Sequence, residues 1–268
     1  MRFLCLHGYA TDSATLEHQL GPLLANLPSD WQYDFVEATS QPSPLILGSL
    51  DGIPSSARCW YNLPTPDALQ NARDDLLRHI DAEGPYEGII GFSQGGMMAV
   101  SLLLWDSALP DGPTLPFKMV ILISAFQSHS LHSGVLEWSK NDGDWEGKKV
   151  LGGEHPVTTR SGWKSDPRSR FDYHLLAGAM EPIPSPVEFL LKYHPDYDTC
   201  RLAIPVVHVR GAKEPNQIMF QDAIQMFGSE DNEILTHSGG HHFPKEAGEL
   251  AEFAEKIMKV AMGVNTLY

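Results

Sequence analysis

Residues 86–96 read Tyr-Glu-Gly-Ile-Ile-Gly-Phe-Ser-Gln-Gly-Gly, and this stretch decides how the chain folds. A short apolar run, residues 88–92, leads into Gly-x-Ser-x-Gly centred on Ser93, and an apolar stretch typical of a helix follows at once. A serine at a sharp turn between a strand and a helix forms a nucleophile elbow, in which small neighbours let the two elements pass close together. We therefore predict that Ser93 is a nucleophile; the competing interpretation is an inert glycine-rich turn.

Strands and helices are predicted to alternate on both sides of this turn. Such alternation is typical of an α/β fold, a mainly parallel sheet with helices on both faces. Ligand sites in such sheets lie at the carboxyl ends of the strands, where Ser93 falls. The predicted strands are 3–6, 33–37, 88–92, 119–124, 206–209 and 233–236. The predicted helices are 14–26, 66–82, 94–105, 217–227 and 245–260.

Two long connections interrupt the alternation, at residues 39–63 and 127–200. Long connections without secondary structure in a compact domain are usually lids or binding loops. We therefore predict one domain over residues 1–268, with a lid-like binding insertion at about 127–200 that contains some helix near 187–193. The competing interpretation of the insertion is a solvent-exposed excursion without a function.

The composition is that of a globular protein and limits the possible partners. A net charge of −15 argues against nucleic-acid or anionic-membrane partners, because phosphate groups would be repelled. The three cysteines, Cys5, Cys59 and Cys200, suit a reducing compartment and lack metal-type spacing, so we expect no metal and no other cofactor. The chain begins with a predicted strand and has no apolar run of transmembrane length, which favours a cytoplasmic protein without a membrane partner.

A histidine must activate the serine, and its position in the chain selects it. In α/β-hydrolases the order along the chain is serine, acid, histidine, with the histidine on a loop after the last strand. His237, His241 and His242 meet that criterion. The preceding pair of glycines gives the loop freedom to return toward Ser93, which favours His241 as the base.

The acid is expected after the strand at 206–209. Glu214 is the first carboxylate beyond the carboxyl end of that strand, at a turn suited to reach inward. Its role would be to orient the imidazole and stabilise its charged form. The alternatives are Asp222, within a predicted helix, and Asp231.

An oxyanion hole requires main-chain amides near the serine. One donor is the amide of Gln94, directly after Ser93, and the second is predicted to be Tyr9, where Gly8 lets the backbone turn after the first strand. His7 lies at the wrong strand for a catalytic base, and we expect it to form a structural hydrogen bond.

Several other residues have predicted positions in the core or the pocket. Trp60, Tyr61 and Phe126 flank predicted strand ends and are candidates to line an acyl-binding pocket. His208 lies in a strand and is expected to be a buried histidine with satisfied hydrogen bonds.

With these residues in place, the chain resembles the fungal serine hydrolase family of the α/β-hydrolase superfamily, which includes lovastatin-type polyketide thioesterases. The resemblance rests on Phe-Leu-Cys-Leu-His-Gly-Tyr at 3–9, Gly-Pro-Tyr-Glu-Gly-Ile-Ile-Gly-Phe-Ser-Gln-Gly at 84–95, Pro-Val-Val-His-Val-Arg-Gly at 205–211 and Gly-Gly-His-His-Phe-Pro at 239–244. The elbow alone is equally similar to acyl-protein thioesterases and carboxylesterases, and the Gly-Pro-Tyr-Glu-Gly run favours the fungal family.

Carried onto this sequence, the resemblance implies a nucleophile at Ser93, a base at His241 and oxyanion amides at Tyr9 and Gln94. The family usually has aspartate where Glu214 stands, and the 127–200 stretch is longer than expected. We therefore predict a serine hydrolase that cleaves an acyl ester or thioester, with a polyketide-type acyl chain on the acyl-carrier domain of a synthase as the suggested substrate. The alternatives are a general carboxylesterase and a binding protein that keeps the fold without turnover.

Overall fold

A computed structural model describes residues 1–43, 52–125, 129–141, 144–151, 187–193, 198–214, 220 and 223–266. Phe126 and Asp222 lie outside these ranges. The main feature is a six-stranded parallel sheet in the order β2-β1-β3-β4-β8-β9. Its strands are β1 (Arg2–Leu6), β2 (Gln32–Val36), β3 (Gly88–Phe92), β4 (Met119–Ile123), β8 (Val206–Gly211) and β9 (Glu233–His237).

The side chains of the central strands are apolar on both faces, which is why this sheet is buried on both sides. Successive strand residues point to opposite faces, so Phe3 and Cys5 of β1 join one apolar cluster whereas Leu4 and Leu6 join another. Cys5 is fully buried, and this burial raises the pKa of its thiol.

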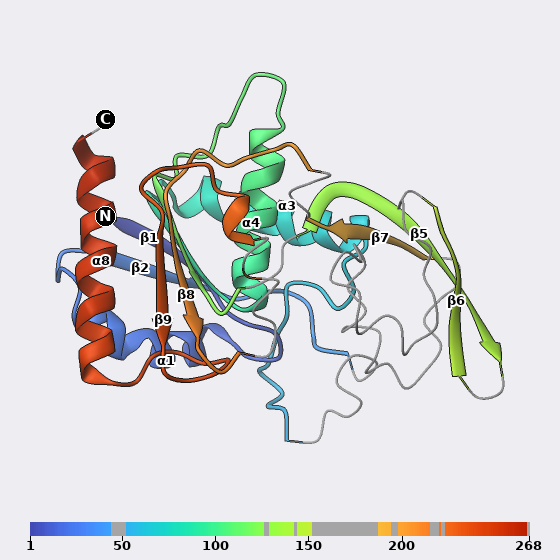
Figure 1. Ribbon diagram of the computed structural model, residues 1–268, viewed down its shortest axis with the longest axis horizontal. Coiled ribbons are helices and arrows are strands. Elements are labelled where there is room, and N and C mark those ends of the chain that lie inside the picture. Colours follow the sequence, from blue (N-terminus) through green and yellow to red (C-terminus); the bar gives the residue numbers. More distant parts are fainter. Residues whose placement is uncertain are drawn as a thin grey trace.

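Helices cover both faces of the sheet (Figure 1). One face packs against α1 (Ser13–Leu24) and α8 (Ala247–Thr266), and the other against α3 (Pro66–Glu83) and α4 (Gln94–Ser107). The Thr65 side chain accepts the first-turn amide of Ala68, and Pro66 begins α3, where its missing N–H costs nothing. The predicted fold class is confirmed, and each predicted strand is present with its ends shifted by no more than two residues.

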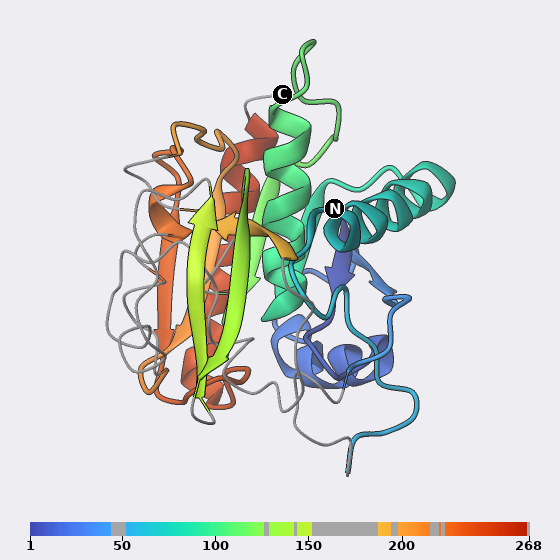
Figure 2. The same ribbon diagram turned by 90° about the vertical axis from the view of Figure 1, so that its right-hand side faces the viewer.

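A second, antiparallel sheet of three strands lies on the α3–α4 side of the molecule, away from α8 (Figures 1 and 2). Its order is β6-β5-β7, formed by β5 (His129–Asn141), β6 (Asp144–Leu151) and β7 (Val187–Lys192). The predicted helix near 187–193 is wrong. Phe189 and Leu191 are buried whereas Glu188 is exposed, so burial repeats every two residues, as in a strand.

Two further sequence predictions bear on this fold. Of the helix predicted at 217–227, the structure describes Phe220 and residues 223–225 as helical and the other positions differently or not at all. No helix in the described part of the chain is long and apolar enough to cross a membrane.

Candidate active site

Ser93 occupies a strained turn between β3 and α4. Its backbone has φ 51° and ψ −118°, a conformation that L-residues rarely adopt and that functional sites retain. A side chain at Gly91 would collide with the main chain of Gly96, so β3 and α4 can meet at this distance only because residue 91 is glycine. The amide of Ser93 donates to the carbonyl oxygen of Ile123 on β4 (2.9 Å), which fixes the turn at the carboxyl edge of the sheet.

Three side chains form a continuous hydrogen-bonded series at this turn. The Oγ of Ser93 lies 2.9 Å from Nε2 of His241, and Nδ1 of the same ring lies 3.1 Å from Oε2 of Glu214. The Glu214 side chain is fully buried and that of His241 is 40% exposed. The structure therefore brings together the predicted nucleophile, base and acid, with the carboxylate shielded and the imidazole open to a substrate.

Pairing between β8 and β9 explains why Glu214 and His241 meet. The two strands are parallel neighbours, so their following loops leave the same edge of the sheet. Main-chain bonds join these loops, from Ala212 N to His237 O and from Lys213 N to Gly239 O, both at 2.8 Å. The loops therefore hold the acid and the imidazole together through the backbone.

The alternative histidines have other roles in this loop. His242 Nε2 accepts the Gly240 amide (3.2 Å), and its Nδ1 donates to the carbonyl oxygen of Phe243 (2.7 Å). His237 is buried, and its Nδ1 accepts the amide of Gly239 (3.1 Å). Both rings thus shape the turn that carries His241.

Of the two alternative acids, the structure describes Asp231 and places it away from the site. Asp231 precedes β9 and therefore lies at the amino end of a parallel strand, the opposite edge from Ser93. Asp222 lies outside the described residues.

Phe92, directly before the serine, supports the imidazole, a contact that the sequence analysis did not anticipate. Its ring centroid lies 5.5 Å from that of His241 and 4.4 Å from that of Phe243. On the other side, a side chain at Gly8 would come within 3.0 Å of the Phe92 ring. The ring therefore fills the space between the first-strand loop and the histidine loop.

The predicted oxyanion amides lie on two segments that touch. A side chain at Gly95 would collide with the carbonyl oxygens of Leu6 and His7, so the first turn of α4 lies directly against the end of β1. Within the described ranges, the amides of Tyr9 and Gln94 donate no hydrogen bond. The Gln94 amide also stands at the positive end of the α4 dipole, where negative charge is stabilised.

His7 has the structural role expected of it. It is fully buried; its Nδ1 donates to the carbonyl oxygen of Gly8 (2.8 Å), and its Nε2 accepts the amide of Ala38 (3.1 Å). Burial lowers the pKa of its imidazole. The ring therefore ties the end of β1 to the chain that follows β2.

The side chain of Gln94 holds the segment containing Trp60 and Tyr61. Its Oε1 accepts the amide of Trp60 (3.0 Å), and its Nε2 donates to the carbonyl oxygen of Tyr61 (2.6 Å). The Trp60 indole in turn donates to the carbonyl oxygen of His7 (2.8 Å). Nothing in the sequence alone predicts this role, because the bonded groups are more than thirty residues apart.

The side chain of Tyr9 belongs to the same network. Its hydroxyl donates to Oδ1 of Asn62 (2.8 Å) and accepts the amide of Ser43 (3.2 Å). Burial raises the pKa of this phenol to about 12, so it stays protonated and keeps donating. The side chain of Tyr9 thus joins Ser43 and Asn62, near the two ends of the 39–63 connection.

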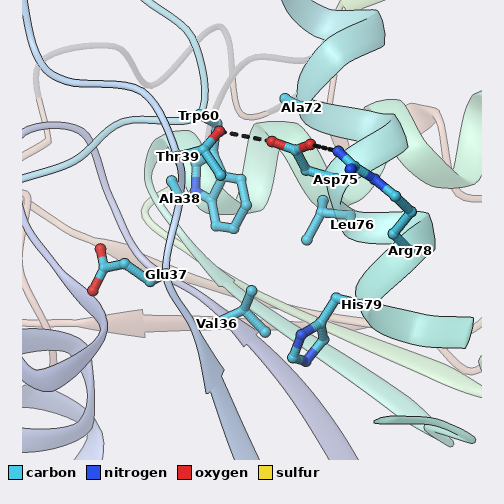
Figure 3. A pocket seen from close by; sticks show the side chains of 10 residues that line it. All are labelled: Val36, Glu37, Ala38, Thr39, Trp60, Ala72, Asp75, Leu76, Arg78 and His79. Atoms are coloured by element: carbon cyan, nitrogen blue, oxygen red, sulfur yellow. Dashed lines mark hydrogen bonds and ion pairs between the residues drawn. The ribbon is translucent and has the colours of Figure 1, made fainter. Parts of the chain in front are cut away.

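The predicted pocket residues have different surroundings. Trp60 borders a pocket of about 310 Å³ between the end of β2 and α3 (Figure 3). Thr39, Asp75 and Arg78 form its polar rim, and the lining includes neither Ser93 nor any residue bonded to it. Tyr61 is buried beside His129, the first residue of β5. Phe126 lies outside the described residues.

Three buried polar side chains on the strands or directly after them have no hydrogen-bond partner among the described residues. They are Ser124, which follows β4 at φ 50°, His129 and His208. His208 is the core residue predicted, but the expectation that its hydrogen bonds are satisfied is wrong, because apolar neighbours such as Phe227 surround the ring. The described residues include no cluster of three or more histidine, cysteine or acidic side chains that could hold a metal ion.

The parallel sheet covered on both faces and the strained serine between β3 and α4 define an α/β-hydrolase. The chain belongs to the family described as serine hydrolase (FSH1), whose model matches residues 1–253. It is therefore a serine hydrolase, as the resemblance predicted.

Similar proteins include fungal hydrolases and a plant protein. Hydrolase FUB4 of Fusarium oxysporum f. sp. lycopersici is 38% identical over 99% of this chain and 100% of its own length. Esterase alnB of Emericella nidulans is 28% identical over 93% of this chain and 92% of its own. The crystal structure of SOBER1 from Arabidopsis thaliana has a TM-score of 0.50 at 14% identity, covering 97% of this chain and 99% of that one, and supports the fold alone.

Proposed function

We propose that this serine hydrolase cleaves an acyl ester or thioester through an acyl-enzyme formed on Ser93. The observation that carries the proposal is the hydrogen-bonded series from Ser93 through His241 to Glu214, with distances of 2.9 and 3.1 Å. Both distances are within the range that proton transfer and imidazole orientation require. A name that specifies an esterase, as alnB has, is in keeping with an ester substrate.

The geometry leads to a sequence of proton transfers. The Nδ1–H of His241 donates to Oε2 of Glu214, which keeps the imidazole in the tautomer whose Nε2 is free to accept a proton. Nε2 then takes the hydroxyl proton of Ser93 as Oγ attacks the substrate carbonyl. The buried carboxylate stabilises the imidazolium, which then protonates the leaving alcohol or thiol. Water, activated by the same imidazole, releases the acid from the acyl-enzyme and restores Ser93.

The amides of Tyr9 and Gln94 would stabilise the negative oxygen that forms during each attack. Both donors belong to backbone that is already fixed, by the first strand and by the start of α4, so the site needs no rearrangement when charge develops. An amide donor of this kind contributes about 3–4 kcal/mol to the transition state.

For the acyl group, we propose a polyketide-type chain carried by the acyl-carrier domain of a synthase, and this finer assignment rests on the sequence resemblance. An internal hydroxyl of such a chain could replace water as the acceptor and give a lactone. A cytoplasmic location accompanies the proposal, supported by three free cysteines.

We also propose that residues of the 127–200 segment form part of the substrate-binding region. Support comes from β5, which follows β4 at the edge of the sheet that carries Ser93 and packs against α4, and from β7, which packs against α3.

The substrate proposal is tested by comparing two acyl donors of equal chain length, an acyl thioester on a purified carrier domain and the corresponding p-nitrophenyl ester. A carrier-domain substrate predicts the larger kcat/KM for the thioester, with Ser93→Ala as the blank for both. Equal or better use of the aryl ester would favour a general carboxylesterase. Ligand binding without turnover of either donor would favour a binding protein.

A further inference from the structure

His129 is a buried histidine close to the proposed active site that the mechanism does not use. It begins β5, is 1% exposed, and neither ring nitrogen has a hydrogen-bond partner among the described residues. Buried polar groups are nearly always matched, because an unmatched donor or acceptor costs free energy in a nonpolar interior. His208 is unmatched in the same way, but it lies within β8 among apolar neighbours such as Phe227. His129 instead begins a strand that packs against α4, the helix that follows Ser93, and there its two unmatched nitrogens point to a ligand with hydrogen-bonding groups.

Contacts through Tyr61 and Gln94 link His129 to Ser93. The rings of His129 and Tyr61 meet edge-to-face, with centroids 5.6 Å apart and planes at 84°. The carbonyl oxygen of Tyr61 accepts the side chain of Gln94, the residue directly after the nucleophile. Tyr61 thus contacts both His129 and the first turn of α4, the helix that follows Ser93.

The chain path agrees with this placement. The carbonyl oxygen of Ile123, at the end of β4, accepts the Ser93 amide at 2.9 Å. Two residues later, the methyl group of Ala125 occupies the space into which a side chain at Gly96 would extend, so this segment lies against the first turn of α4. β5 begins at His129 and itself contacts α4.

The imidazole of His129 is suited to an uncharged oxygen group. Burial lowers the pKa of His129 to about 3, and Lys192, its pairing partner on β7, adds to that shift, so the ring is neutral near pH 7. A neutral imidazole offers one N–H donor and one acceptor. A hydroxyl group can use both, and a keto oxygen can use the donor.

A second unmatched group strengthens the assignment. Ser124 is fully buried at the same end of β4, and its hydroxyl has no partner among the described residues. Its backbone holds the strained φ of 50° that functional sites tend to retain. Two buried residues with unmatched polar groups, Ser124 and His129, thus lie close together in the chain, just after the strand whose Ile123 accepts the Ser93 amide.

We propose that His129 is a specificity-determining residue that binds a hydroxyl or keto oxygen on the acyl chain of the substrate. The inference rests on the proposed function, in which Ser93 takes up that acyl chain. A site built to hydrogen-bond a substrate oxygen discriminates strongly against analogues that lack it, because its own polar groups are then left unmatched.

The test uses p-nitrophenyl octanoate and a series of its hydroxylated analogues, with one hydroxyl at each successive carbon from the third onward. The native protein should prefer at least one hydroxylated ester by roughly 10- to 100-fold in kcat/KM, the effect of one hydrogen bond left unmade in the plain ester. His129→Phe should remove that preference and leave the rate on plain octanoate within about threefold, because the change affects a substrate contact and not the chemistry. His18→Phe, on the exposed face of α1, is the matched control and should behave like the native protein.

Each outcome separates this inference from the proposed function. A native protein that cleaves all the esters equally overturns the role of His129, whether or not the variant folds. A His129→Phe protein that keeps the preference, or that loses rate equally on every ester, overturns it as well, the second result indicating a structural role. His129→Gln, which keeps a donor and an acceptor, should retain part of the preference. Failure of the native protein to cleave any ester would instead count against the proposed function.

Discussion

The two sides of Ser93 are held in place by different kinds of bond. On one side, the loops after β8 and β9 are joined by main-chain bonds at 2.8 Å and carry Glu214 and His241. On the other side, main-chain bonds hold the residues just before Trp60, from Arg58 N to Thr11 O (2.7 Å) and from Cys59 N to Ser40 O (2.9 Å). Trp60 and Tyr61 themselves are held by the side chain of Gln94. Main-chain bonds survive most substitutions, apart from proline and side chains at Gly211, which would collide with the Gly239 and Gly240 carbonyl oxygens. The bonds from the Gln94 side chain are lost in one substitution.

This difference separates the chemistry from the selection of substrate. Glu214 and His241, the proposed proton-transfer groups, lie on loops that main-chain bonds hold together. Because both would act on every substrate, replacing either should lower the rate on all substrates alike. The side-chain-held segment lies next to His129 and the start of β5. Changes there should alter stability and selectivity more than the chemical step.

The largest effect is expected from the serine and the histidine. Ser93→Ala and His241→Ala should each lower kcat by roughly 10⁴- to 10⁶-fold, because neither residue acts without the other. Steady-state hydrolysis of a p-nitrophenyl ester measures this, with Ser55→Ala and His18→Ala, both exposed, as controls. If His241→Ala were as active as the native protein while His242→Ala lost activity, the assignment of His241 as the base would be contradicted.

A smaller effect is expected from the acid on the same side of the site. Glu214→Gln removes the charge that stabilises the imidazolium while it keeps the size of the side chain, and should lower kcat by roughly 10²- to 10⁴-fold on any ester. Glu255→Gln, an exposed position on α8, is the control. A loss confined to one substrate would show that Glu214 acts on binding, and would remove the distinction between the two sides.

On the opposite side, Gln94→Met should reduce stability by about 2–4 kcal/mol. It removes the hydrogen bonds to the buried amide of Trp60 and to the carbonyl oxygen of Tyr61, each worth about 1–3 kcal/mol when the group is buried. The main-chain amide of Gln94 remains, so kcat on a small ester should change far less than in Glu214→Gln. Urea denaturation measures the free energy of unfolding, with Gln70→Met on the exposed face of α3 as the control. An unchanged free energy of unfolding would mean that Gln94 does not hold this segment.

The smallest effect is expected from His208, a buried residue of β8, the strand that leads to Glu214. Burial, aided by the charge of Arg210, lowers the pKa of His208 to about 3, so the folded protein keeps the ring neutral while the unfolded chain takes up a proton below about pH 6.5. Stability from this ring is therefore full above about pH 6.5 and is lost as the pH falls toward 3. Between about pH 7 and pH 4.5 the loss should reach roughly 2–3 kcal/mol.

Replacing this ring tests the effect directly. The decrease in the free energy of unfolding between the two pH values should be smaller in His208→Phe than in the native protein. His18→Phe, with an exposed ring, should leave the pH dependence unchanged. Parallel curves for His208→Phe and the native protein would show that His208 titrates normally in the fold.

The sequence predicts the features that local patterns determine and not those that depend on contacts between distant segments. The elbow, the six parallel strands and the positions of Glu214 and His241 follow from strand order and from short glycine-rich turns, which are local patterns. The strand at Val187–Lys192 was mistaken for a helix because its pairing with β5 crosses a long stretch of chain. The bonds of Gln94 and the buried ring of His129 also depend on contacts between distant segments, and no local pattern marks them.

The most direct measurement is the intact mass of the native protein and of Ser93→Ala after exposure to a fluorophosphonate, which reacts with activated serines. We expect one adduct on the native protein, none on Ser93→Ala, and a strongly slowed reaction in His241→Ala, because the hydroxyl is activated through the bond at 2.9 Å. An adduct that persists in Ser93→Ala, or no adduct on a folded native protein, would contradict the assignment of Ser93 as the nucleophile.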